Sequence, residues 1–237
     1  SKPLAVSQYY GRLGQRIISA VMARTAEGTL YEVDMRLRPS GNKGPISTAF
    51  DGFIKYYNES AWTWEHMTLV RTRPIFDTKG LGTEVKGTID RILCKHRDVQ
   101  ALASDVATMR ARIQNQYKKP CPWAIKHTPG GLVDVDFIAQ YLVLAHGEEN
   151  PEILCKKSHD IIQAAAKLDF INQQDAQALM SAASLYQQVL TFLSLVIEGE
   201  LTNERVAQFS SALRRDLIEI TDSENFEDLE KRLVDTE

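Results

Sequence analysis

The chain has 237 residues, of which 43% are hydrophobic and 25% are charged. This is the composition of an ordinary globular protein, and the length suffices for one large domain or two small ones. The formal net charge of −3 argues against a dedicated nucleic-acid-binding protein, which would carry a marked surplus of basic residues. It leaves open a site that binds a single nucleotide.

Cysteine usage and hydropathy favour a cytoplasmic protein. Cys94, Cys121 and Cys155 stand far apart and form no CxxC pair, so neither a zinc site nor a redox pair is expected. An odd number of thiols fits a reducing compartment. We find no apolar run of membrane-spanning length and no secretory signal. The chain begins without a methionine, which fits a processed protein or a piece of a longer one.

The segment 31–38 has the pattern of a β-strand. Its side chains alternate between apolar and charged, so that one face is apolar and the other carries Glu32, Asp34, Arg36 and Arg38. The loop that follows is rich in Gly and Pro and must adopt special backbone angles.

Helical spacing of apolar residues accounts for most of the remaining chain. The predicted helices cover residues 7–24, 50–57, 61–73, 102–113, 132–146, 172–198 and 206–217. Prolines and glycines between 118 and 131 predict a break, and a capping box at Thr221–Glu224 predicts a last short helix. The layout is therefore α+β, with a small mixed α/β part over residues 1–85 and a mainly α-helical bundle over residues 86–237.

Asp34 is the first candidate for chemistry. A hard carboxylate is a typical Mg²⁺ ligand, and the ion would bridge nucleotide phosphates. The forked guanidinium groups of Arg36 and Arg38 match phosphate oxygens. An exposed or salt-bridged aspartate on a strand is the alternative, and the residues alone leave both interpretations open. The turn at Ser40–Gly41 could present backbone N–H groups to an anion, although such a turn is as often purely structural.

Two further stretches contain residues with chemical potential. Trp62 and Trp64 cannot share one helical face, and core packing is the commoner fate of tryptophan. His66 has the chemistry of a general base, but the sequence pairs it with no nucleophile.

The second stretch leads from Lys126 through a Gly130–Gly131 pair into a predicted helix. A glycine pair before a helix leaves free N–H groups at the positive end of the helix dipole, where Asp134 and Asp136 are favourable. Helical residues two apart diverge by about 200°. This Asp-x-Asp is therefore not expected to hold a metal as a pair.

Four stretches of the sequence together resemble the glutamine synthetase adenylyltransferase family. They are VDMRLRPSG at 33–41, AWTWEH at 61–66, VRTR at 70–73 and GGLVDVDFI at 130–138. The resemblance extends from Gly11 to Asp222. It implies a bifunctional enzyme in which one half attaches AMP from ATP to a tyrosine of glutamine synthetase and the other removes it by phosphorolysis. Ser40 and His66 are similar to the attaching, C-terminal half.

The resemblance implies a catalytic centre of three carboxylates, of which Asp34 matches the third. The other two belong to an upstream Gly-Ser…Asp-x-Asp segment that is not found in this sequence. The chain would then be an N-terminally truncated C-terminal half, inactive alone, because two-metal chemistry needs ligands for both ions. The resemblance further implies Mg²⁺ as cofactor, with Asp34 as catalytic and metal-binding residue. The implied nucleotide-binding residues are Arg36, Arg38, Ser40, Lys126 and Asp136.

The same resemblance implies a partial nucleotidyltransferase domain over residues 1–85 and a helical domain over residues 86–237. The implied partners are glutamine synthetase, the PII signal protein, ATP and glutamine as effector, with no nucleic acid and no membrane. Two alternatives remain open. One is the adenylyl-removing half or a PII uridylyltransferase-like enzyme, and the other is a non-catalytic helical module that binds PII or glutamine synthetase.

Overall fold

The computed structural model describes residues 4–29, 32–117, 123–197, 199 and 201–235. The chain forms two compact units, Ser1–Ile92 and Leu93–Glu237, and each is described by itself. The boundary predicted at residue 85 falls inside a helix, α4 (Leu81–Leu93).

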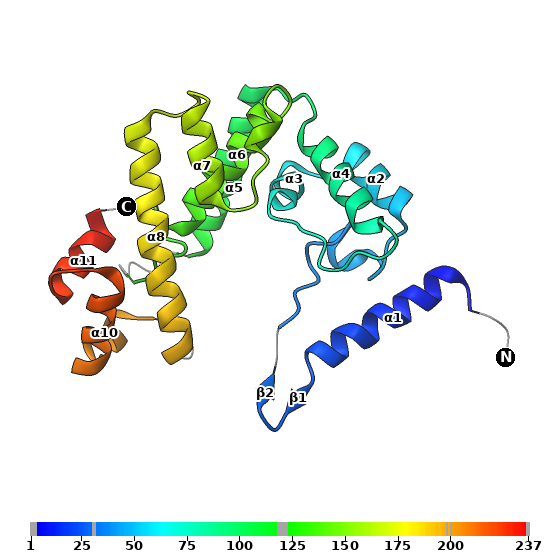
Figure 1. Cartoon of the computed structure of the whole chain (residues 1–237). Helices are drawn as coiled ribbons and strands as arrows, with labels where there is room; N and C mark the ends of the chain where they lie inside the picture. Colours follow the sequence, from blue (N-terminus) through cyan, green and yellow to red (C-terminus); the bar gives the residue numbers. More distant parts are fainter. Residues whose placement is uncertain (1–3, 30–31, 118–122, 198, 200, 236–237) are drawn as a thin grey trace. The chain divides into compact units, whose positions relative to one another are not determined.

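The first unit is built from helices and long loops (Figure 1). Its helices are α1 (Val6–Val21), the 3₁₀ turn η1 (Gly41–Lys43), α2 (Phe50–Glu59), α3 (Thr63–Val70) and α4. Its buried apolar side chains come from α2, α3 and α4: Tyr57, Met67, Leu69, Val70, Ile89 and Ile92. The core of this unit is therefore formed by three short helices.

The helix α1 contributes no buried residue. It contacts the loop before α2, where a Cβ added to Gly14 would lie 2.9 Å from Cγ2 of Ile46. Glycine at this position therefore allows the helix and the loop to approach closely. The rest of its apolar surface is open, since Val6, Tyr9 and Ile17 are 74%, 54% and 55% exposed.

The strand predicted over residues 31–38 is wrong, and with it the α+β fold class and the α/β character of the first domain. Residues 32–35 have no regular structure, residues 36–40 form turns, and Tyr31 lies outside the described residues. Alternation gives a strand its two faces but no partner for its backbone N–H and C=O groups. Instead, the Asp34 carboxylate accepts the backbone N–H of Arg36 at 2.9 Å, a local bond that competes with sheet pairing.

Strands in the described part of the chain amount to one short hairpin. β1 (Arg24–Thr25) pairs antiparallel with β2 (Gly28–Thr29), with Arg24 opposite Thr29. The structure is otherwise helical wherever it is regular.

The second unit is a helical bundle. Its elements are α5 (Val99–Gln116), α6 (Leu132–His146), η2 (Pro151–Ile153), α7 (Ser158–Lys167), α8 (Gln173–Val196), α9 (Asn203–Ala207), α10 (Ser211–Thr221) and α11 (Phe226–Asp235). Helices α6, α7 and α8 pack on one another, α5 packs on α6, and α10 packs on both α8 and α11. Figure 1 shows α8 as the long helix that runs from α7 to α10.

The core of the bundle follows α8, from which Tyr186, Val189 and Leu193 are buried. At one end of this core, the Trp123 ring stacks on Phe226 with 5.4 Å between centroids. By length and composition α8 could also span a membrane, which the sequence did not lead us to expect. A core helix of a bundle meets the same criterion, and α8 packs on three neighbours.

Most predicted helices are confirmed, and the helix over 132–146 has the predicted ends. The helix predicted over 172–198 is observed as α8; Glu198 lies outside the described residues, as do Cys121 and the first part of the predicted break at 118–131. The single helix predicted over 206–217 is wrong. It is divided into α9 and α10 because Ser210 begins a new helix, its Oγ accepting the N–H of Leu213 at 3.2 Å.

The capping box predicted at Thr221–Glu224 is also wrong. The Thr221 hydroxyl donates to the Leu217 carbonyl at 2.7 Å, so this residue belongs to the end of α10. The cap of α11 is Asn225, whose Oδ1 accepts the N–H of Asp228 at 2.9 Å. Asparagine is as good a cap as the residues in the predicted box.

Candidate functional site

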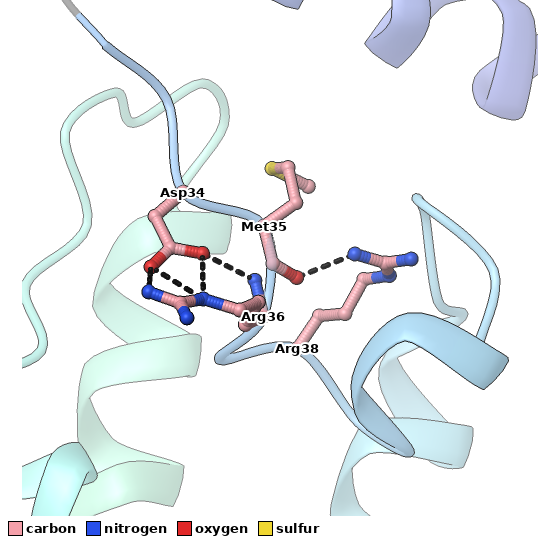
Figure 2. A network of polar contacts seen from close by, with 4 residues as sticks. All are labelled: Asp34, Met35, Arg36 and Arg38. Carbon is pink, nitrogen blue, oxygen red and sulfur yellow. Dashed lines mark hydrogen bonds and ion pairs between the residues drawn. The ribbon is translucent and has the colours of Figure 1, made fainter. Parts of the chain in front are cut away.

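Asp34 and Arg36 form a closed ion pair in the loop before η1 (Figure 2). The Arg36 Nε donates to Oδ1 and Oδ2 at 3.0 and 2.9 Å, and Nη2 donates to Oδ2 at 2.7 Å. The backbone N–H of Arg36 completes the set. The Asp34 side chain is 51% exposed and that of Arg36 is 76% exposed, so the pair is accessible to solvent and to a ligand.

This pairing fixes the charge of Asp34. The side-chain bonds from Arg36, followed by its backbone bond, lower the pKa of Asp34 to about 2. The residue is therefore a carboxylate at every physiological pH, as a hard cation requires of its ligand. Arg36 already neutralises that charge, so a metal ion and the guanidinium would compete for the same two oxygens.

Arg38 is hydrogen-bonded to backbone carbonyls that precede and follow it in the sequence. Its Nη1 donates to the Met35 carbonyl, as Figure 2 shows. Its Nε donates to the Gly44 carbonyl at 3.2 Å. Its own carbonyl accepts the N–H of Gly41 at 2.8 Å. Arg38 therefore links the start and the end of the segment 35–44 and gives this loop a defined shape.

The turn at Ser40–Gly41 is left-handed at both residues, with φ of 62° and 53°. Glycine adopts this conformation freely, whereas a non-glycine residue pays roughly 1–2 kcal/mol. The N–H groups of Gly41, Lys43 and Gly44 are bonded to loop carbonyls. An anion would therefore meet a turn whose N–H groups are largely engaged, which weakens the interpretation of the turn as an anion cradle.

Glu65 and His66 of the segment 61–66 are hydrogen-bonded to the helix α2. Glu65 is 6% exposed, and its two carboxylate oxygens accept the Tyr56 hydroxyl at 2.7 Å and the Trp62 N–H at 2.9 Å. The ring nitrogens of His66 lie 2.9 Å from the Tyr57 carbonyl and 3.2 Å from the Trp62 carbonyl. Carbonyls only accept hydrogen bonds, so His66 is oriented by the backbone rather than by a nucleophile.

The second predicted cluster contains a partly buried ion pair between α5 and α6. Arg110 and Asp134, 13% and 23% exposed in their side chains, are bonded to each other. Arg110 also donates to the carbonyls of His127 and Thr128 at 3.2 and 3.0 Å, and Asp134 accepts the N–H of Gly130 at 2.7 Å. The pair fixes the Gly-rich turn at the start of α6, which confirms Asp134 as a helix-start acid.

Asp136 faces another neighbour, since it accepts the Ser158 hydroxyl of α7 at 2.6 Å. The two carboxylates of the Asp-x-Asp sequence thus bond to different helices, Asp134 to α5 and Asp136 to α7. In the part of the chain that the structure describes, no three His, Cys, Asp or Glu side chains gather as a metal site would require. Asp34 can therefore offer one ligand position, with others supplied by phosphate, water or residues elsewhere.

The predicted site residues fall into two groups. Asp34, Arg36, Arg38 and Ser40 lie within one loop of the first unit, and Lys126 and Asp136 lie near the start of α6 in the second unit. Lys126 is exposed. Sequence reasoning missed Arg110, although a charge four residues after Val106, on the apolar side of a helix, is a sign of a buried partner.

Each of the two units matches a model of a known protein family. Residues 1–88 match the family model described as Glutamate-ammonia ligase adenylyltransferase, and residues 98–228 match the model described as GlnD PII-uridylyltransferase. These matches define a protein related to the nucleotidyltransferases of nitrogen metabolism.

Three curated relatives carry the name bifunctional glutamine synthetase adenylyltransferase/adenylyl-removing enzyme. Those of Xanthobacter autotrophicus and Bradyrhizobium diazoefficiens are 38% and 37% identical over 237 and 236 residues. That of Rhodopseudomonas palustris is 39% identical over 236 residues. The alignments cover 100% of this chain in each case, and 24%, 23% and 24% of the relatives.

The chain belongs to the glutamine synthetase adenylyltransferase family, which confirms the resemblance drawn from its motifs. It spans about a quarter of the length of these relatives.

Proposed function

We propose that this chain is part of a cytoplasmic enzyme that transfers AMP from ATP to a tyrosine of glutamine synthetase. The observation that carries the proposal is the loop of Asp34, Arg36 and Arg38, in which an ionised carboxylate is paired with the Arg36 guanidinium and the Arg38 guanidinium bonds the Met35 and Gly44 carbonyls. The match of residues 1–88 to an adenylyltransferase model supports it. The PII signal protein and glutamine are the proposed regulators.

Asp34 and Arg36 exchange partners in this proposal. Mg²⁺ in nucleotide sites is held by one or two carboxylates together with phosphates and water, so Asp34 fits one of its positions. The ion would supply neutralisation of the phosphate charge. Arg36, released from Asp34, then offers its forked donors to a phosphate. Arg38 and Ser40 keep the shape of the loop, and Ser40 lies at the nucleotide.

Lys126 and Asp136 of the second unit are proposed as further nucleotide-binding residues. The exposed ammonium of Lys126 suits a phosphate oxygen. Asp136 is already bonded to Ser158 at 2.6 Å, so the contribution of this unit depends first on Lys126.

The match of residues 98–228 to the GlnD PII-uridylyltransferase model favours a second set of candidates. One is a uridylyltransferase-like enzyme, and another is the adenylyl-removing direction that the relatives' name includes. A non-catalytic module that binds PII or glutamine synthetase is the third.

A chimera tests these candidates. The matching quarter of the Xanthobacter autotrophicus relative is replaced by this chain, and transfer of labelled AMP from ATP to glutamine synthetase is measured with Mg²⁺ present. We expect transfer by the chimera and a loss of about 100-fold or more in Asp34→Asn, because removing one electrostatic group from a phosphoryl-transfer site commonly costs that much. Unimpaired transfer by Asp34→Asn would remove Asp34 from the site.

The same chimera separates the alternatives. Release of AMP from modified glutamine synthetase by phosphate would assign the removing direction, and labelling of PII from UTP would assign a uridylyltransferase. Binding of PII or glutamine synthetase by the chain, with no transfer of any kind by the chimera, would leave the non-catalytic module.

A further inference from the structure

A cavity in the second unit is lined by two side chains of opposite charge. Its volume of about 360 Å³ lies within the range of small-ligand sites, roughly 300–1,000 Å³. Arg214 of α10 and Glu230 of α11 supply the charges. The other lining residues are apolar or uncharged: Trp123, Asn203, Val206, Ala207 and Phe226. The cavity therefore combines a cation and an anion with an apolar wall.

The Arg214 guanidinium is held in place but is only partly hydrogen-bonded. Its Nη2 donates to the Ala207 carbonyl at 3.2 Å, at the end of α9. Its Cζ lies over the Phe226 ring, 4.7 Å from the centroid. The Nε atom is buried and has no hydrogen-bond partner among the described residues. A guanidinium carries several N–H donors, so the bond to Ala207 leaves donors for a carboxylate.

The Glu230 carboxylate is also positioned by a single hydrogen bond. Its Oε1 accepts Nε1 of Trp123 at 3.2 Å, and the Trp123 ring is 2% exposed and stacks on Phe226. A carboxylate has a second oxygen with which to accept hydrogen bonds. Within the described ranges Glu230 and Arg214 form no ion pair with each other, although both line the same cavity. Each charge is therefore available to a ligand.

Two opposite charges in one cavity favour a ligand that carries both signs. A phosphate or another anion would be repelled by the Glu230 carboxylate, and a simple cation would be repelled by the Arg214 guanidinium. A zwitterion bonds to both groups, and charge-assisted hydrogen bonds are roughly twice as strong as neutral ones. The apolar wall of Val206 and Phe226 suits the uncharged remainder of such a molecule.

We propose that this cavity binds a free α-amino acid. In this proposal Arg214 binds the carboxylate, Glu230 binds the ammonium group, and the side chain of the ligand lies along Val206 and Phe226. The inference goes beyond the proposed transfer of AMP and does not depend on it, because it concerns binding to the second unit alone.

A purely structural role is the competing explanation, because Arg214 also bonds the end of α9 and Glu230 also bonds the Trp123 indole. The main variant is therefore Glu230→Gln, whose amide oxygen can still accept the indole N–H while the negative charge is lost. Its control is Glu227→Gln, at an exposed position of the same helix. Arg214→Gln and Arg215→Gln form a second pair, and the Arg215 side chain is 76% exposed.

Isothermal titration calorimetry of the intact chain with leucine and with glutamine measures the affinity. We expect at least one of the two amino acids to bind. The same amino acid should bind about tenfold more weakly, or worse, when its amine is acetylated or its carboxyl group is amidated, since each change removes a charge-assisted hydrogen bond. Equal affinity for the blocked forms would overturn the inference, and so would the binding of neither amino acid.

The variants locate the site. Glu230→Gln should weaken binding about tenfold or more, whereas Glu227→Gln should keep the wild-type affinity. Arg214→Gln should differ from Arg215→Gln in the same way, and the glutamate pair decides alone if Arg214→Gln does not fold. A folded Glu230→Gln protein that binds the amino acid as tightly as the wild type would show that this carboxylate bonds only the Trp123 indole. That result, or equal weakening in Glu227→Gln, contradicts the proposed site.

Discussion

Arg36 surrounds the carboxylate of Asp34 with its guanidinium and its own backbone N–H, over distances of 2.7 to 3.0 Å. Two residues that are only two positions apart thereby form a preassembled unit of one anion and one cation. The negative charge of Asp34 is stabilised by its partner, and the exposed pair remains accessible to water.

Arg36→Ala should raise the pKa of Asp34 from about 2 toward its ordinary value of 3.8, because the bonds from Arg36 are the main cause of the shift. The lowered pKa contributes stability that is complete above the unfolded value and is lost as the pH falls through about 2. Carboxyl chemical shifts recorded by NMR between pH 1 and pH 6 measure the titration. An Asp34 that still titrates near 2 in Arg36→Ala would show that another group holds the charge.

Two glycines of the first unit should respond oppositely to alanine. A Cβ on Gly44 would overlap the Pro39 carbonyl oxygen, whereas a Cβ on Gly87, inside α4, meets nothing within 4 Å. Gly87→Ala should therefore stabilise the unit by roughly 0.5–1 kcal/mol, the usual gain in a helix. Gly44→Ala should destabilise it and loosen the loop.

Thermal unfolding followed by circular dichroism compares the two variants directly. Each serves as the control for the other, since both add one methyl group to the same unit. A stabilised Gly44→Ala protein would mean that the loop shifts freely away from Pro39, which would contradict the rigid loop inferred from the Arg38 bonds.

The helical part of this fold could be predicted from the sequence because its signal is local. Apolar residues repeat at helical spacing along α6 and α8, and both helices were predicted. The prediction of a strand over residues 31–38 was wrong because alternation describes only the two faces of a strand. Whether a partner strand exists is a tertiary property, and Asp34 instead closes a local bond with Arg36.

The site was predictable only where its residues are neighbours in the chain. Asp34, Arg36 and Arg38 were chosen for their chemistry; Asp34 and Arg36 are bonded to each other, and Arg38 is bonded to the Met35 carbonyl. The bond between Tyr56 and Glu65 and that between Arg110 and Asp134 join different helices. A single sequence does not show which residues of different helices face each other, so neither of these two contacts was predicted.

The pair of Arg110 and Asp134 should matter more for stability than the exposed ion pairs of the same unit. Removing one partner of a fully buried pair typically costs about 3–5 kcal/mol, because the other charge is left uncompensated, and a partly buried pair such as this one lies at or below the lower end of that range. Arg110 also satisfies two carbonyls of the Gly-rich turn. Arg110→Ala should therefore destabilise the second unit by about 3 kcal/mol.

Urea unfolding of the chain with Phe at positions 62 and 64, so that the fluorescence of Trp123 alone is followed, measures this effect. The matched control is Arg215→Ala, whose side chain is 76% exposed and lies 3.5 Å from Asp216. An exposed pair is worth about 0–1 kcal/mol. A loss in Arg110→Ala no larger than that of the control would mean that the pair is not needed to hold the turn.

The second unit should lose stability as the pH falls below about 6.5. Burial, aided for His127 by the charges of Lys126 and Arg110, lowers the pKa of His127 and of His146 below the ordinary value of 6.5. The His146 ring is covered on one side by Phe170, with the ring centroids 3.8 Å apart. The unfolded chain therefore binds more protons than the folded one in this range. The stability is complete above pH 6.5 and declines as the pH falls toward the lowered pKa values of the folded state.

Urea unfolding at pH 7.5, 6.5 and 5.5 gives the slope of the unfolding free energy against pH, and a double variant with Gln at positions 127 and 146 should flatten that slope. A slope that is the same in the double variant would assign the pH dependence to other groups.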